Sequence, residues 1–74
     1  MTDNGVILFY TTSSALKAEK MLIKVGLEVK LIPVPRELSS DCGIALRFNW
    51  KDHEQIASHL VSASVEIDSI HPLE

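Results

Sequence analysis

The only cysteine of the 74-residue chain, Cys42, lies in the segment Ser39-Ser40-Asp41-Cys42-Gly43. A cysteine thiolate is a nucleophile, and a thiol beside helix N-terminal N–H groups or a cation ionises below the free pKa of about 8.5. The same segment also has the composition of a plain turn, in which a small thiol simply packs. Residue types alone therefore leave two interpretations open, a reactive thiol and an inert one.

Two predicted elements precede this segment in the amino-terminal part of the chain. Residues 6–11 form a nearly continuous apolar and β-branched run, which is typical of a strand covered on both faces. Apolar residues then recur at helical spacing between the hydroxyl-rich start of the next segment and Gly26, which predicts a helix over about 14–25. The lysines at 17, 20 and 24 are expected on its solvated outer face.

Three further strands are predicted from alternation of apolar and polar side chains. Residues 27–31 alternate, and Pro33 and Pro35 restrict this strand to a sheet edge because proline cannot donate to a ladder. Residues 44–50 alternate as a third strand, and residues 65–68 as a last, half-exposed one.

A second helix is expected between the last two strands. Asp52 and Gln55 resemble a capping pair at its start. Its buried stripe is expected to consist of Ile56, Ala57, Leu60 and Val61. Just before this helix, Phe48 and Trp50 are interpreted as core residues, and His53 as a residue at the boundary of the core.

The order β-α-β-β-α-β predicts an α+β fold, a ferredoxin-like sandwich with a four-stranded antiparallel sheet and two helices on one face. In that topology the first and third strands are central, and the second and fourth are edges. One domain is expected over 1–74, with a folded core over about 6–70. The helices would leave one sheet face open although the strands carry apolar residues toward it. A second copy of the chain is therefore expected to cover that face in a twofold homodimer.

The same topology places the loop before the third strand at the sheet end where the first helix begins. Cys42 is therefore expected beside Thr12, Ser13 and Ser14, where N–H groups and the helix dipole stabilise anions. Cys42 is two residues before Ile44, so the alternation places both on the same side of the third strand. That side is assigned to the face of the sheet that the helices cover. The thiol is thus expected to point toward the amino end of the first helix.

Other side chains of the loop complete the predicted site. Arg36 could add positive charge, and the hydroxyls of Ser39 and Ser40 could bind an oxyanion or the thiolate itself. Gly43 lets the backbone turn closely. Asp41 acts in the opposite direction, because an adjacent carboxylate disfavours ionisation of the sulfur.

Composition excludes several classes of protein. A net charge of −3 argues against a general nucleic-acid binder, although the segment 17–51 holds every Lys and Arg and is mildly basic. No apolar run is long enough to span a membrane, and the amino terminus lacks the features of a secretory signal, so a cytoplasmic protein is predicted. A lone cysteine cannot close an internal disulfide. Neither a metal nor a cofactor is expected, since His53 and His59 would lie on different helix faces.

Two blocks of sequence resemble a known family. The first is Ala-Leu-Lys-Ala-Glu-Lys at 15–20, and the second runs from Leu-Ile-Pro-Val-Pro-Arg at 31–36 through Ser-Ser-Asp-Cys-Gly-Ile-Ala-Leu-Arg-Phe at 39–48. These blocks resemble the selenium/sulfur carrier protein-like family of small bacterial domains. A serine is common before the Cys-Gly pair in that pattern, and this chain has Asp41 there instead.

The resemblance implies a carrier rather than a freestanding enzyme. Cys42 would hold sulfur or selenium as a persulfide- or selenosulfide-type adduct, receive it from a donor enzyme and pass it to an acceptor protein. Two alternatives stay open. One is a ligand-sensing or oligomerisation module in which Cys42 merely packs, and the other is a redox-sensing thiol protein in which Cys42 is reversibly oxidised.

Overall fold

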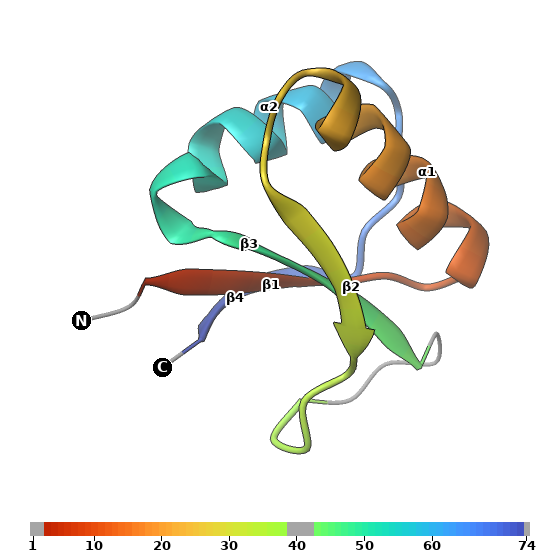
Figure 1. Ribbon diagram of the computed structural model, residues 1–74. Coiled ribbons are helices and arrows are strands. Elements are labelled where there is room, and N and C mark those ends of the chain that lie inside the picture. Colours follow the sequence, from red (N-terminus) through yellow and green to blue (C-terminus); the bar gives the residue numbers. More distant parts are fainter. Residues whose placement is uncertain (1–2, 39–42, 74) are drawn as a thin grey trace.

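A four-stranded antiparallel sheet forms one layer of the fold, and two helices form the other (Figure 1). The computed structural model describes residues 3–38 and 43–73. The elements in chain order are β1 (Asn4–Leu8), α1 (Thr12–Lys24), β2 (Val29–Pro33), β3 (Ile44–Asn49), the 3-10 turn η1 (Trp50–Asp52), α2 (His53–Ser62) and β4 (Ser69–Leu73). In this part of the chain, neither helix has the length and apolar character needed to cross a bilayer.

The strand order is β2-β3-β1-β4, with every neighbouring pair antiparallel. β1 and β3 are therefore central, and β2 and β4 are edges. This arrangement confirms the predicted ferredoxin-like sandwich. The end of β1 lies beside the start of β3, because Leu8 pairs with Ala45 in the register of the two strands.

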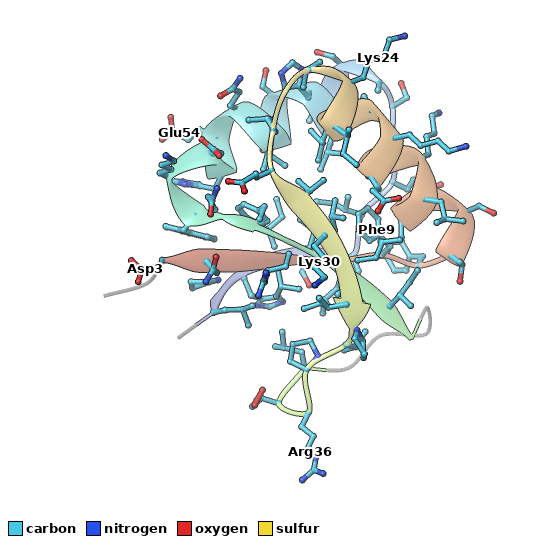
Figure 2. The ribbon with its side chains drawn as sticks, viewed as in Figure 1. Asp3, Phe9, Lys24, Lys30, Arg36 and Glu54 are labelled. Carbon is cyan, nitrogen blue, oxygen red and sulfur yellow. The ribbon has the colours of Figure 1, made fainter. Side chains whose placement is uncertain are left out.

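The main core lies between the helices and the sheet. α1 contributes Ala15, Ala18 and Leu22, and α2 contributes Ile56 and Leu60. The sheet contributes the alternate residues that face the helices, and Phe9 follows directly after β1 and is fully buried (Figure 2). Two amphipathic helices on one face of the sheet thus bury a single continuous cluster.

A second, smaller cluster lies on the opposite face of the sheet. Its buried members are Val6, Leu8 and Ala45, and they pack against Ile32, Val34, Leu38 and Leu73. The chain after β2 and the end of β4 therefore cover the apolar residues that suggested a twofold homodimer. The homodimer stays a prediction, and its apolar driving force is smaller than the sequence indicated.

The last strand was predicted in the right order, but its bounds over 65–68 were wrong, since β4 covers Ser69–Leu73. After α2, Ser64 adopts a left-handed conformation (φ 56°), and the Val65 N–H donates to the Leu60 carbonyl at 3.0 Å. Val65 is consequently a core residue of the connection to the last strand. The Asp68 N–H donates to the Leu8 carbonyl at 2.7 Å, and pairing with β1 continues over β4.

Two expectations for the second helix were also wrong. Val61 is 79% exposed, whereas Ile56 and Leu60 are buried as predicted. Asp52 is the residue before α2, but its side chain makes no capping hydrogen bond. Instead, η1 leads into the helix, and the ring of His53 stacks on Trp50 with centroids 4.5 Å apart.

The first strand and first helix were predicted in the right order but with shifted ends. β1 begins at Asn4 and ends at Leu8 instead of covering 6–11. α1 begins at Thr12, because Thr11 adopts an extended conformation and caps the helix. The chain thus leaves the sheet earlier than its apolar run indicated, and Phe9 packs in the core as part of the link to α1.

Candidate functional site

The first turn of α1 is at the surface and carries hydroxyl groups. Thr11 Oγ1 accepts a hydrogen bond from the Ser14 N–H at 3.2 Å and donates to Ser14 Oγ at 3.1 Å. Thr12 and Ser13 are exposed, and the first turn holds no acidic side chain. No carboxylate of that turn therefore competes with an external anion for the positive end of the helix dipole.

The start of β3 lies at the same end of the sheet as the start of α1. Leu8 and Ala45 are paired at this end, and α1 begins four residues after Leu8, while Gly43 directly precedes β3. The Gly43 carbonyl accepts a hydrogen bond from the Val34 N–H at 3.4 Å, which ties this point to the chain leaving β2. The topological part of the predicted site is thus present in the described residues.

Gly43 has a left-handed backbone with φ of 79°. A Cβ added there would meet no described residue within 4 Å, and a φ of this sign favours glycine through backbone conformation. The extended alternation of β3 therefore ends at Ile44. Ile44 and Leu46 do pack with the helices as predicted, but their alternation cannot be extended through Gly43 to orient a preceding side chain.

Cys42, Ser39, Ser40 and Asp41 lie outside the described residues. The expected position of the thiol beside Thr12, Ser13 and Ser14 therefore stays a prediction.

Arg36 is exposed in the connection between β2 and β3. Figure 2 shows its guanidinium directed away from the sheet and from the region that Figure 1 labels α1. The structure does not bring Arg36 together with the hydroxyls of the first helical turn. A role for it at the thiol would require the side chain to turn back.

Two of the three partly buried histidines, His53 and His71, have polar neighbours within the fold. His53 Nδ1 lies 2.8 Å from the Trp50 carbonyl oxygen, and His71 Nε2 lies 2.7 Å from Ser69 Oγ. Among residues 3–38 and 43–73, no group of three or more His, Cys, Asp or Glu side chains could hold a metal ion. His53 is a boundary residue packed on Trp50, as the sequence indicated.

A polar groove on the sheet face opposite the helices was missed from the sequence. Its cavity volume is about 270 Å³, and its polar lining comprises Asn4, Glu28, Lys30, Arg47 and Asn49. The alternation of β2 and β3 already placed Lys30 and Arg47 on the sides away from the helices. Only the strand register shows that these two residues are direct neighbours.

A sequence profile described as "Putative Se/S carrier protein-like" matches residues 4–72 of the chain. This match spans the whole sheet except its last residue, both helices and the segment that holds Cys42. Searches of curated proteins and of solved structures found no significant match.

Proposed function

Because the chain belongs to the Se/S carrier protein-like family, we propose that it carries sulfur or selenium on Cys42 between a donor enzyme and an acceptor protein. The family match over residues 4–72 is the observation on which this proposal rests. Cys42 is the only cysteine available to hold such an adduct. A cytoplasmic location, where thiols stay reduced, agrees with this chemistry.

The proposed loading step is a transfer between sulfur atoms. The Cys42 thiolate attacks the terminal sulfur of a persulfide on the donor, forming a new S–S bond while the donor's S–S bond breaks. The donor leaves as a thiolate, and Cys42 becomes a persulfide, so the step needs no external oxidant. Transfer to the acceptor repeats the same exchange with Cys42 as the leaving thiolate.

The geometry at the start of α1 supports this chemistry. A thiolate or persulfide anion at the sheet end where α1 begins would be stabilised by the positive end of the helix dipole. The exposed first turn of α1, which holds no acidic side chain, leaves room for such an anion. The carrier needs no bound cofactor, since the donor generates the sulfur or selenium atom.

We expect the protein to gain the mass of one sulfur atom when it is incubated with a cysteine desulfurase and cysteine. Selenocysteine in place of cysteine should give the corresponding selenium adduct, because the desulfurase releases both elements at the same oxidation level. Intact-mass spectrometry under non-reducing conditions measures both products. Cys42→Ser is the control and should gain neither.

The alternatives give different results in the same experiment. Absence of any adduct on the native chain would contradict a carrier and favour a sensing or oligomerisation module with an inert cysteine. An adduct that no acceptor protein removes would favour a redox-sensing thiol. Chasing the loaded protein with candidate acceptors therefore separates carrying from mere reactivity.

We further expect the apparent pKa of the Cys42 thiol to lie below the free value of about 8.5, because α1 begins at the same end of the sheet. Ser13→Asp adds a carboxylate to the exposed first turn and should raise that pKa. Alkylation by iodoacetamide at neutral pH should then slow about two- to fivefold, because a charge at a helix end interacts with the helix dipole by about 0.3–1 kcal/mol. Ser13→Asn, which adds no charge, should leave the rate unchanged. Equal rates in all three proteins would show that α1 does not act on the thiol.

A further inference from the structure

The sheet face opposite the helices carries two exposed cations, one on the edge strand β2 and one on its neighbour β3. Lys30 on β2 and Arg47 on β3 are direct partners in the strand register, and both side chains are exposed. Figure 2 labels Lys30 on its strand. Like charges placed directly opposite each other on neighbouring strands destabilise a sheet. The free protein therefore carries an unfavourable charge pair at this point.

None of the described acids forms an ion pair with either cation. The one acid in the surrounding groove, Glu28, accepts a hydrogen bond from Asn49 Nδ2 at 3.3 Å. An anion from outside the chain would relieve the repulsion, and it would find amide groups of Asn4 and Asn49 beside the two cations.

We infer that this groove is a docking site for an acidic peptide segment of a partner protein. Arg47 can bind a carboxylate through two parallel hydrogen bonds, and Lys30 can bind a second carboxylate as a point charge. The groove, defined by Asn4, Glu28, Lys30, Arg47 and Asn49, is open along the sheet and has a volume of about 270 Å³. The inference rests on the proposed function in one respect, since a carrier must dock with a donor or an acceptor.

Two other occupants fit the groove less well. A second copy related by a twofold axis that passes through the groove would oppose the two cations with the same two cations. RNA binding on a sheet face usually needs aromatic rings on which bases stack. Phe48 is among the residues that line the groove, but it is 1% exposed and packs in the main core, so its ring is not available for stacking.

The groove is separate from the proposed thiol site. Arg47 lies four residues along the chain from Gly43, which corresponds to roughly 13 Å of extended strand. Asn4 begins β1, and Lys30 is the second residue of β2. The groove therefore lies toward the sheet end opposite the one where β1 leads to α1. A segment seated there would hold the partner across the open face and leave the end of the sheet beside α1 accessible.

The test is titration of the isotope-labelled protein with a short synthetic oligo-glutamate peptide, followed by backbone amide NMR. Shift changes are expected at Lys30, Arg47 and their strand neighbours, and added salt should weaken binding. Lys30→Gln/Arg47→Gln should lower the affinity about tenfold or more, because both binding charges are removed. Lys17→Gln/Lys20→Gln makes the same charge change on the exposed face of α1 and should leave binding intact.

Several outcomes would overturn the inference. These are no binding by the native protein, equal binding by the groove variant, shift changes centred on α1, or tighter binding of an oligouridylate than of the acidic peptide. A dimer in sedimentation experiments whose formation shifts the amides of Lys30 and Arg47 would also overturn it. The amide spectrum itself shows whether each variant is folded.

Failure of docking and failure of the carrier function are distinguishable. Cys42→Ser should bind the acidic peptide like the native protein, because the groove does not include the thiol. The groove variant should still take sulfur at Cys42 from a small persulfide such as glutathione persulfide. Loss of loading in the desulfurase assay but not with the small donor would place the defect in docking.

Discussion

Phe9→Ala is expected to lower the free energy of unfolding by about 3–5 kcal/mol. Phe9 is fully buried just after β1, among core residues from the sheet and both helices (Figure 2). The total stability of a chain of this length is roughly 4–11 kcal/mol. The variant should therefore lose a large part of its stability, which urea denaturation followed by circular dichroism measures.

Tyr10→Ala is the matched control, because it removes the neighbouring aromatic side chain. Tyr10 is 52% exposed, so its truncation should change stability by no more than about 0.5 kcal/mol. Similar losses in the two variants would contradict the packing seen at the end of β1. Phe9→Leu should recover most of the lost stability, since it restores apolar volume.

The contrast between Phe9 and Tyr10 bears directly on the candidate site. α1 begins two residues after Tyr10, and the buried Phe9 side chain anchors the link from β1 to α1 in the core. A loosened link would move the first turn of α1 relative to the start of β3. Sulfur loading at Cys42 should therefore fall with Phe9→Ala even at temperatures where the sheet is still folded.

The fold could be predicted because several local signals agree. The continuous apolar run in β1 predicted a central strand, and the prolines after Leu31 predicted an edge strand. The structure confirms both positions. Alternation in β3 and the helical spacing of Ala15, Ala18 and Leu22 pointed to the same two-layer arrangement. Agreement between levels of this kind is what a foldable sequence is expected to have.

The strand boundaries that were predicted wrongly depend on tertiary contacts. Val65 and Ile67 alternate with acids as a strand would, but they pack against the core from a connection. Strand pairing starts only where Asp68 reaches the Leu8 carbonyl. Alternation reports which side chains are buried, and it cannot by itself report which backbone groups pair.

The candidate site could be predicted only in part. The βαββαβ order determines that β3 starts at the sheet end where α1 begins, and the structure confirms that relation. The direction of the thiol could not be derived in this way, because Gly43 breaks the alternation at φ of 79°. The docking groove was hidden for another reason, since Lys30 and Arg47 are 17 residues apart and become neighbours only through the register.

Gly5→Ala is expected to destabilise the protein by about 1–3 kcal/mol through overpacking. Gly5 is buried and pairs with Phe48, and an added Cβ would lie 2.5 Å from Phe48 Cζ and 2.6 Å from Trp50 Cε3. Neither ring can move freely, because Phe48 is buried and Trp50 is stacked between Phe48 and His53. Alanine has fewer conformations than glycine in the unfolded chain, and this effect offsets only about 0.4–1 kcal/mol of the loss.

Gly26→Ala is the comparison that separates crowding from backbone strain. Gly26 has φ of 87°, and an added Cβ would have no described atom within 4 Å, so the expected loss of stability of about 1–2 kcal/mol would come from backbone conformation. Phe48→Leu removes the ring atom nearest an alanine Cβ at position 5. The double variant Gly5→Ala/Phe48→Leu should therefore be more stable than the sum of the two single losses predicts, by about 0.5–3 kcal/mol. The losses of stability caused by Phe48→Leu and by Gly26→Ala should simply add in the double variant. Additive losses in both double variants, measured by urea denaturation, would mean that the aromatic stack of Phe48, Trp50 and His53 yields to a methyl group.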